Sequence, residues 1–118
     1  MKEHVRIMLT EEEVNARIEE IAEQINRDFD GQPLHLICIL KGGAMFMCEL
    51  AKRLTMPVSF DFMSVSSYGG GTTSSGVVRI VKDLDESLEG KRVLIVEDII
   101  DTGRTLASLI EILKQRGP

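Results

Sequence analysis

VLIVEDIIDTGRTL, residues 93–106, is the stretch that decides the fold of this chain. It opens with four consecutive apolar residues, which is typical of a short strand covered on both faces of a sheet. Glu97 and Asp98 follow the strand, and a helical pattern begins after Gly103. In open α/β sheets, ligands bind beyond the carboxyl ends of the strands. The turn that follows this strand is therefore a candidate ligand site.

Patterning outside this stretch predicts the rest of an α/β domain. Thr10 and Glu13 have the spacing of a capping box, and apolar residues three to four apart predict a helix that ends near residues 28–31. The other expected elements are a strand at 34–40, a helix at 44–54, strands at 58–63 and 77–82 joined by a polar loop at 66–76, a strand at 93–96 and a final helix. This order predicts one α/β domain, residues 1–118, with a largely parallel sheet flanked by helices and an antiparallel flap.

Composition excludes several classes of function. The formal net charge of −5 disfavours a nucleic-acid-binding surface, which needs clustered Lys and Arg. No apolar run approaches the roughly 20 residues that span a bilayer, so no membrane partner is expected. Cys38 and Cys48 lie in apolar surroundings without metal-ligand spacing, and we predict both to be buried free thiols. These features together predict a cytoplasmic protein.

The turn after the strand at 93–96 has the chemistry of a phosphate site. Gly103 allows the backbone to approach a ligand, and Thr102 and Thr105 add hydroxyl donors at a helix N-terminus. Glu97 and Asp98 would repel a phosphate, so we expect them to act on sugar hydroxyls and a hydrated Mg²⁺. Each residue also has an ordinary interpretation, in which Thr102 or Asp101 is an N-cap and the acidic pair is a solvated strand end.

The fourteen residues together resemble the phosphoribosyl-diphosphate signature of type I phosphoribosyltransferases, and the ED-x-x-DTG form resembles their hypoxanthine-guanine branch. By this resemblance, Glu97 and Asp98 hold the ribose hydroxyls and Mg²⁺, and Asp101 is the catalytic proton acceptor near N7 of the purine. Residues 102–105 would cradle the 5′-phosphate. The residues of this loop implied in substrate binding are Glu97, Asp98, Ile100, Asp101, Thr102, Gly103, Arg104 and Thr105.

Two further segments resemble the same family. Lys41 and Gly42, after the first strand, match the pyrophosphate loop, in which the peptide before the lysine is often cis. Ser67 and Tyr68 match a catalytic loop that excludes water from the reaction. Taken alone, the first segment is also compatible with a plain strand-to-helix turn and the second with an ordinary hairpin tip.

The resemblance covers about residues 5–118 and implies Mg²⁺-dependent transfer of a phosphoribosyl group from phosphoribosyl diphosphate to hypoxanthine or guanine, with release of pyrophosphate. Family members continue with further strands and a hood, so we expect those C-terminal strands and the hood to be missing and a sheet edge to be exposed. The apolar helix at 44–54 predicts contact with a neighbouring subunit in a homodimer or homotetramer. A non-catalytic nucleotide-binding module and an RNA-binding regulator of the same fold stay open.

Overall fold

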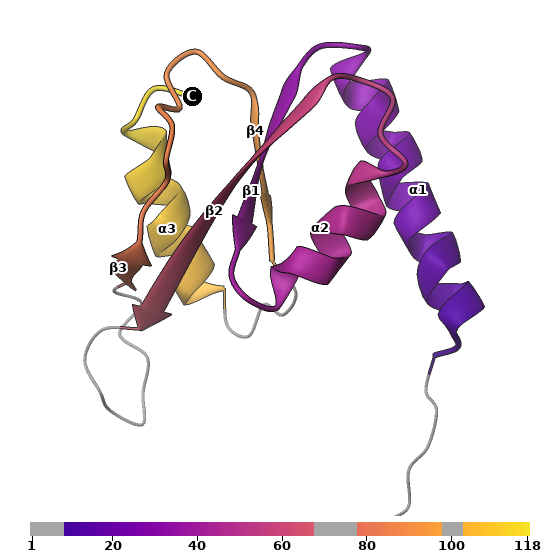
Figure 1. The fold of residues 1–118 in the computed structure, drawn as a ribbon, viewed down its shortest axis with the longest axis horizontal. Coiled ribbons are helices and arrows are strands. Elements are labelled where there is room, and N and C mark those ends of the chain that lie inside the picture. The colour runs from indigo at the N-terminus through magenta and orange to yellow at the C-terminus, as the bar shows by residue number, and fades with distance from the viewer. Residues whose placement is uncertain (1–8, 68–77, 98–102) are drawn as a thin grey trace, which may run out of the picture.

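The computed structural model describes residues 9–67, 78–97 and 103–118. Among these residues, four strands form one sheet in the order β3-β2-β1-β4, as Figure 1 shows. The strands are β1 (Leu34–Ile39), β2 (Val58–Ser67), β3 (Val78–Lys82) and β4 (Val93–Val96). β1 is parallel to both β2 and β4, whereas β3 is antiparallel to β2. The prediction of a largely parallel sheet with an antiparallel flap is confirmed.

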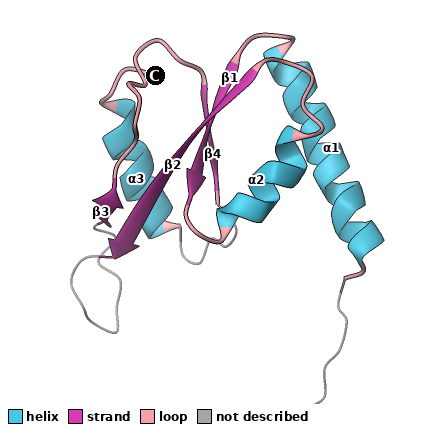
Figure 2. Ribbon diagram, in the orientation of Figure 1, coloured by secondary structure: helices cyan, strands magenta, loops and turns pink. Residues whose placement is uncertain are grey.

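Helices lie on both faces of the sheet (Figure 2). They are α1 (Glu11–Phe29), α2 (Gly43–Ala51) and α3 (Arg104–Lys114). α1 and α2 pack over one face, where Leu36, Cys38 and Val96 belong to one buried cluster. α3 packs over the other face, where Leu109 and Leu113 join a second buried cluster. The strands between the two layers are thus covered from both sides.

Helix α1 begins at its predicted cap. The backbone N–H of Glu13 donates to Thr10 Oγ1 at 3.1 Å. The Glu13 carboxylate accepts from the Thr10 hydroxyl at 3.2 Å instead of reaching the Thr10 backbone N–H, so only half of the capping box forms. The helix ends at Phe29, within the predicted range, and Asp30 follows it with φ 44°. Not one of the described helices is long and apolar enough to cross a membrane.

Strand β1 is the centre of the sheet, and all six of its residues are buried. β4 is the outer strand of the described sheet, and only Val96 in it is fully buried. Beside β4 lies an open apolar hollow of about 600 Å³, bordered by Leu94, Leu106 and Ile110. Within the described residues, β4 therefore has no strand on its outer side, and apolar surface lies beside it.

Three details differ from the sequence predictions. Cys48 is exposed, so the prediction of two buried thiols is wrong for this residue, while Cys38 is buried. The second helix ends at Ala51 rather than at 54, because the chain turns there towards β2. β2 extends to Ser67, beyond the predicted start of the loop, because Ser66 and Ser67 pair with the beginning of β3.

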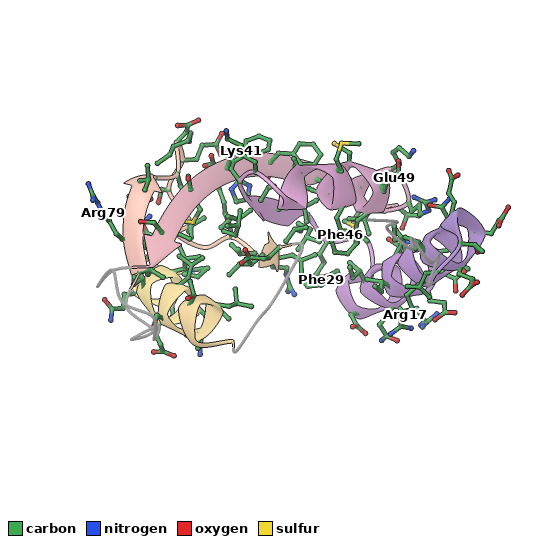
Figure 3. The ribbon with its side chains drawn as sticks, turned by 90° about the horizontal axis from the view of Figure 1, so that it is seen from below. Arg17, Phe29, Lys41, Phe46, Glu49 and Arg79 are labelled. Carbon is green, nitrogen blue, oxygen red and sulfur yellow. The ribbon has the colours of Figure 1, made fainter. Side chains whose placement is uncertain are left out.

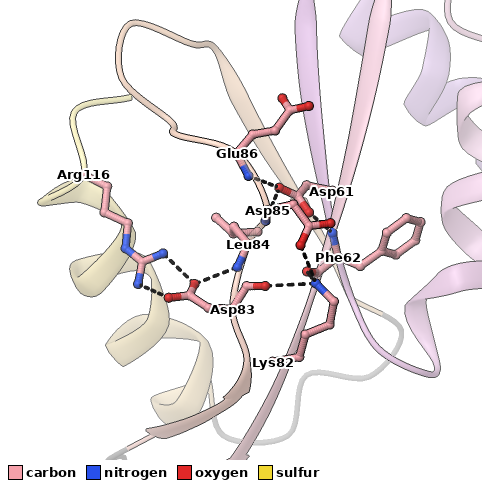
Figure 4. A network of polar contacts seen from close by, with 8 residues as sticks. All are labelled: Asp61, Phe62, Lys82, Asp83, Leu84, Asp85, Glu86 and Arg116. Carbon is pink, nitrogen blue, oxygen red and sulfur yellow. Dashed lines mark hydrogen bonds and ion pairs between the residues drawn. The ribbon is translucent and has the colours of Figure 1, made fainter.

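A buried carboxylate ties β2 to the segment that leads into β4 (Figure 4). Asp61 is 3% exposed. Its Oδ1 accepts from the backbone N–H of Phe62 at 2.8 Å, and its Oδ2 accepts from those of Asp85 and Glu86 at 2.9 and 3.0 Å. Three backbone donors to one carboxylate satisfy its buried charge and fix the turn at 83–86 on the sheet.

Candidate functional site

The two turns that carry the predicted phosphate chemistry leave the sheet at the same edge. β1 and β4 are adjacent and parallel, with Cys38 opposite Val96. Lys41 follows β1 and Glu97 follows β4, so both residues lie beyond the carboxyl ends of neighbouring strands. α2 and α3 also begin at this edge, as the lower side of Figure 1 shows. The sheet therefore brings two helix N-termini, a lysine and a carboxylate to one end of the domain.

Gly43 sets how closely the two turns approach. It is buried at the start of α2, and a Cβ placed on it would lie 2.9 Å from the carbonyl oxygen of Val96 and 3.5 Å from Cα of Glu97. Real Cβ atoms do not come that close to a backbone oxygen, so only glycine fits between the two backbones. The first turn of α2 consequently packs directly on the end of β4.

The turn between β1 and α2 contains the backbone feature that the resemblance implied. The peptide bond between Leu40 and Lys41 is cis, although Lys41 is not a proline. The Leu40 N–H donates to Met63 O at 2.8 Å, and the Ala44 N–H donates to Lys41 O at 3.2 Å. Lys41 itself is exposed (Figure 3). An exposed ammonium beside the free N–H groups of a helix start can bind an anion.

Helix α3 begins at the second turn. Its N-cap is Gly103, with φ 82°, and the Ala107 N–H donates to Gly103 O at 2.8 Å. The structure has Gly103 at the N-cap position, and the alternative that placed Asp101 or Thr102 there falls on residues outside the described part of the chain. The N–H groups of the first helical turn have no partner within the helix, and Thr105 is half-buried among them. This arrangement suits a phosphate oxygen, because glycine leaves the approach to the N–H groups open.

Glu97 is the one predicted metal ligand that lies in the described residues, and it is half-buried. Carboxylate oxygen is the donor that Mg²⁺ prefers in proteins, so the chemistry of this side chain fits the ion. Across the described part of the chain, no three His, Cys, Asp or Glu side chains converge as a metal cluster. A Mg²⁺ ion at this edge would thus need ligands from substrate and water as well, which is its usual mode of binding.

The predicted site residues divide into three groups. The described structure places Lys41, Gly42, Glu97, Gly103 and Thr105 at one edge of the sheet. For Ser67 and Arg104 it describes the backbone, at the end of β2 and the start of α3. The predictions for Tyr68, Asp98, Ile100, Asp101 and Thr102 lie outside the described residues.

Sequence reasoning missed the role of Gly43 at the site and the burial of Asp61 in β2. Gly43 follows Lys41 and Gly42, the two residues that match the pyrophosphate loop, and the sequence offered no separate reason to single it out. Its close approach to Val96 depends on the pairing of β1 with β4, which no local pattern shows. Asp61 alternates with apolar residues in β2, a pattern that ordinarily indicates a solvent-facing position. The signal for its burial was the long polar segment after β3, whose backbone N–H groups need acceptors.

Comparison with known proteins places the chain among enzymes of one family. The model of the phosphoribosyl transferase domain family matches residues 5–118. A hypoxanthine-guanine phosphoribosyltransferase of Staphylococcus aureus is 51% identical over 110 residues, which is 93% of this chain and 62% of the relative. A similar crystal structure is that of a hypoxanthine-guanine phosphoribosyltransferase from Bacillus anthracis, which has a HEPES molecule in its active site. It superposes with a TM-score of 0.91 at 38% sequence identity, and the match covers 99% of this chain and 69% of that protein.

A second similar structure concerns assembly. It is a Trypanosoma cruzi hypoxanthine phosphoribosyl transferase, studied for the role of its C-terminal region in oligomeric state and enzymatic activity. Its TM-score is 0.89 at 44% identity, and the match covers 100% of this chain and 67% of that protein. The chain spans about three-fifths of the length of the curated relatives it matches.

Proposed function

This chain belongs to the phosphoribosyl transferase domain family, and from that membership we propose that it carries the phosphoribosyl-diphosphate site of a purine phosphoribosyltransferase. The reaction is Mg²⁺-dependent transfer of the phosphoribosyl group to hypoxanthine or guanine. A bond forms between a purine ring nitrogen and C1′, the bond from C1′ to the pyrophosphate oxygen breaks, and the purine loses a proton. The products are the nucleoside monophosphate and pyrophosphate.

One observation carries this proposal: Gly43 packs on Val96, and the pyrophosphate-type and phosphate-type turns thereby meet at one sheet edge. Phosphoribosyl diphosphate carries phosphate groups at both ends of a ribose, so its site needs two anion-binding turns a short distance apart. Lys41 and the start of α2 form the first turn, and Gly103 with the start of α3 forms the second. The carboxylate of Glu97 stands at the end of β4, directly before the second turn.

The proposed roles follow from the charge of each group. Lys41 and Gly42 bind the departing pyrophosphate, which gains negative charge as the bond to C1′ breaks. Residues 102–105 bind the 5′-phosphate through helix N–H groups and hydroxyls. Glu97 and Asp98 hold the ribose hydroxyls and the Mg²⁺ that accompanies the diphosphate, where the ion supplies charge neutralisation.

The remaining roles fall on residues outside the described part of the chain or described only by their backbone. Asp101 is proposed as the acceptor of the purine proton, because a carboxylate within hydrogen-bond reach can act as a general base. Ser67 and Tyr68 are proposed to exclude water from C1′. Ile100 and Arg104 are proposed as further substrate contacts.

A calorimetric titration of phosphoribosyl diphosphate with Mg²⁺ into the 118-residue chain tests the proposed site. We expect saturable binding that Lys41→Gln weakens at least about tenfold, since a charge-assisted contact contributes about 1.5–3 kcal/mol. The matched control is Lys52→Gln at the far end of α2, where the lysine pairs with Glu49 at 3.0 Å. Equal weakening by both variants, or no binding at all, would exclude a site at this edge.

Formation of inosine monophosphate, assayed with hypoxanthine, tests the transfer itself. The Asp101→Asn variant should lose most of the rate that the unsubstituted protein shows, whereas Asp28→Asn on the exposed side of α1 should keep it. Binding of phosphoribosyl diphosphate without transfer to any purine would instead identify a non-catalytic binding module.

We also propose that the protein self-associates as a homodimer or homotetramer. Met47, Cys48, Phe60 and Phe62 border an open apolar hollow of about 540 Å³ between α2 and β2. Phe60 is 45% exposed, and apolar surface of this kind is typical of a subunit contact. Sedimentation should show an oligomer that Phe60→Lys dissociates and that Val81→Lys, at a 64% exposed residue of β3, leaves intact.

The cellular location is proposed to be the cytoplasm. Both cysteines are free thiols, and Cys48 is exposed, which suits a reducing compartment.

A further inference from the structure

A hollow with polar side chains on its border lies at the opposite end of the sheet from Lys41 and Glu97. Its volume is about 300 Å³, and His35, Ser59 and Arg92 are among the residues that border it. His35 is near the start of β1, whereas Lys41 follows the end of that strand. Because a strand rises about 3.3 Å per residue, β1 separates the hollow from the candidate active site by roughly 16 Å or more.

His35 is buried in this region with one ring nitrogen unsatisfied. The residue is 2% exposed, and its Nδ1 lies 2.6 Å from Ser59 Oγ. Nε2 is buried and has no hydrogen-bond partner. Burial lowers the pKa of His35, and the nearby charge of Lys91 lowers it further, against the opposing charges of Asp61 and Glu86. The ring is therefore neutral at pH 7, with a proton on only one nitrogen.

The Ser59 hydroxyl decides which nitrogen carries that proton. If Ser59 Oγ–H donates to Nδ1, the proton of the neutral ring is on Nε2, and a buried N–H donor is left without an acceptor. Such a donor costs free energy unless an oxygen reaches it. An oxygen of a bound ligand would supply the missing acceptor.

The rim of the hollow is cationic, although the chain as a whole carries a net charge of −5. Lys91 pairs with Glu86 at 2.8 Å, and its side chain is 35% exposed. Arg92 is exposed, and within the described residues no ion pair involves it. Lys91 and Arg92 are adjacent cations, and Arg92 has no acidic partner among the described residues. A site bordered by them favours an anion over a neutral molecule.

We propose that this hollow, bordered by His35, Ser59, Lys91 and Arg92, is a second oxyanion site that takes a phosphate group, with Nε2–H of His35 as its innermost donor. Nε2 is shielded from solvent in the free protein, so the proposal requires the atoms that cover it to move when the ligand enters. Lys91 turns from Glu86 to the ligand, and Arg92 closes over the outer oxygens. A single water could satisfy Nε2, but it would leave Arg92 without an anionic partner among the described residues.

The tautomer of His35 is the first test, and it requires no ligand. The sequence contains two histidines, His4 and His35, so ¹⁵N spectra of the imidazole rings are simple to assign with a His4→Gln variant. We expect the His35 proton on Nε2 in the free protein and a shift of that population towards Nδ1 in Ser59→Ala. A proton on Nδ1 in the unsubstituted protein would overturn the proposal, because the bare Nε2 lone pair would then repel an anion.

Titration with inorganic phosphate at constant ionic strength is the second test. The His35 Nε2 signal should shift saturably, and Arg92→Gln should weaken this binding about tenfold. Arg79→Gln is the matched control, because Arg79 is an exposed cation on β3 outside the hollow (Figure 3), and it should change nothing. Lys41→Gln should also leave the His35 response unchanged, which separates this site from the proposed active site.

The same titration with ribose 5-phosphate distinguishes a free anion from a phosphate monoester. Tighter, Arg92-dependent binding of the ester assigns the site to sugar phosphates, and binding of inorganic phosphate alone assigns it to the free ion. No saturable shift with either compound, or equal weakening by Arg79→Gln and Arg92→Gln, would show general charge attraction and would refute the site.

Discussion

Gly43, the first residue of α2, lies so close to Val96, the last residue of β4, that a Cβ on the glycine would be 2.9 Å from the valine carbonyl oxygen. The two residues are 53 positions apart in the chain, and each directly precedes or follows a turn of the candidate site. Their contact fixes the distance between those turns through backbone atoms alone. Side-chain changes elsewhere in the site therefore leave this spacing intact.

Gly43→Ala should destabilise the protein and weaken phosphoribosyl diphosphate binding together. Alanine in a helix is ordinarily favoured over glycine by about 0.5–1 kcal/mol, but forcing a methyl group against Val96 O costs about 1–3 kcal/mol. We expect a net loss in the free energy of unfolding, measured with urea. Gly31→Asn is the control, because Gly31 has open space around it and asparagine tolerates its φ of 77°. Unchanged stability and binding in Gly43→Ala would show that α2 adjusts freely.

The sequence was sufficient to predict the elements with strong local signals. The nearly unbroken apolar run of β1 predicted a strand covered on both faces, and the strand is buried at every residue. The cis peptide before Lys41 was predicted from the resemblance alone, since no local pattern encodes it. The order of helices and strands predicted a parallel sheet, and the pairing of β1 with β2 and β4 confirms it.

Features that depend on distant partners could not be predicted. Cys48 lies on an apolar helix, which indicated burial, but the described residues leave that face of α2 open. Phe60 is 45% exposed while its neighbour Asp61 is 3% exposed, the reverse of what hydrophobicity alone indicates. The reason is that Asp61 meets backbone donors from a segment more than twenty residues away. Alternation in a strand identifies two faces but not which face other elements cover.

Asp61→Asn should cost about 2–3 kcal/mol of folding free energy, because the amide offers one acceptor oxygen where the carboxylate offers two. The Asn NH₂ group is a donor, and in either orientation it would face another donor, which is the backbone N–H of Phe62 or the backbone N–H groups of Asp85 and Glu86. Urea unfolding measures the loss. Asp85→Asn is the matched control: its side chain is 79% exposed and pairs with Lys82 only at 3.5 Å, so a change within about 0.5 kcal/mol is expected. Similar costs for the two variants would contradict the structural role of Asp61.

Arg116→Gln should reduce stability at neutral pH by about 0.5 kcal/mol and have no effect in acid. Arg116 donates to both oxygens of Asp83 at 2.7 and 3.0 Å (Figure 4). The Arg116 hydrogen bonds lower the pKa of Asp83, with help from the backbone N–H of Leu84. A lowered carboxyl pKa stabilises the fold above the unfolded value of about 3.9, and this contribution disappears as the pH falls through the folded pKa.

A double-mutant cycle of Arg116→Gln with Asp83→Asn, measured by urea unfolding at pH 7 and pH 3, isolates this pair. The coupling should be largest at pH 7 and should shrink as the pH falls towards the lowered folded pKa of Asp83. Lys114→Gln is the control, because the Lys114 side chain is 68% exposed and lies 3.6 Å from Glu111. A coupling that does not shrink as the pH is lowered would mean that Arg116 acts by packing instead of charge.

His35 should make the protein less stable as the pH falls from about 7.5 towards 5.5. Its folded pKa is lowered, first by burial and then by Lys91, while Asp61 and Glu86 act in the opposite direction. The unfolded chain, with a histidine pKa of about 6.5, therefore takes up a proton in this range before the folded protein does. The stabilising contribution of neutral His35 is fully present above the pKa of the unfolded chain, and it is lost as the pH falls through the pKa of the folded protein.

Urea unfolding at several pH values should show a shallower decline in the free energy of unfolding for His35→Gln than for the unsubstituted protein, with His4→Gln as the control. Parallel pH profiles for His35→Gln and the unsubstituted protein would mean that the ring is protonated as easily in the fold as in the unfolded chain.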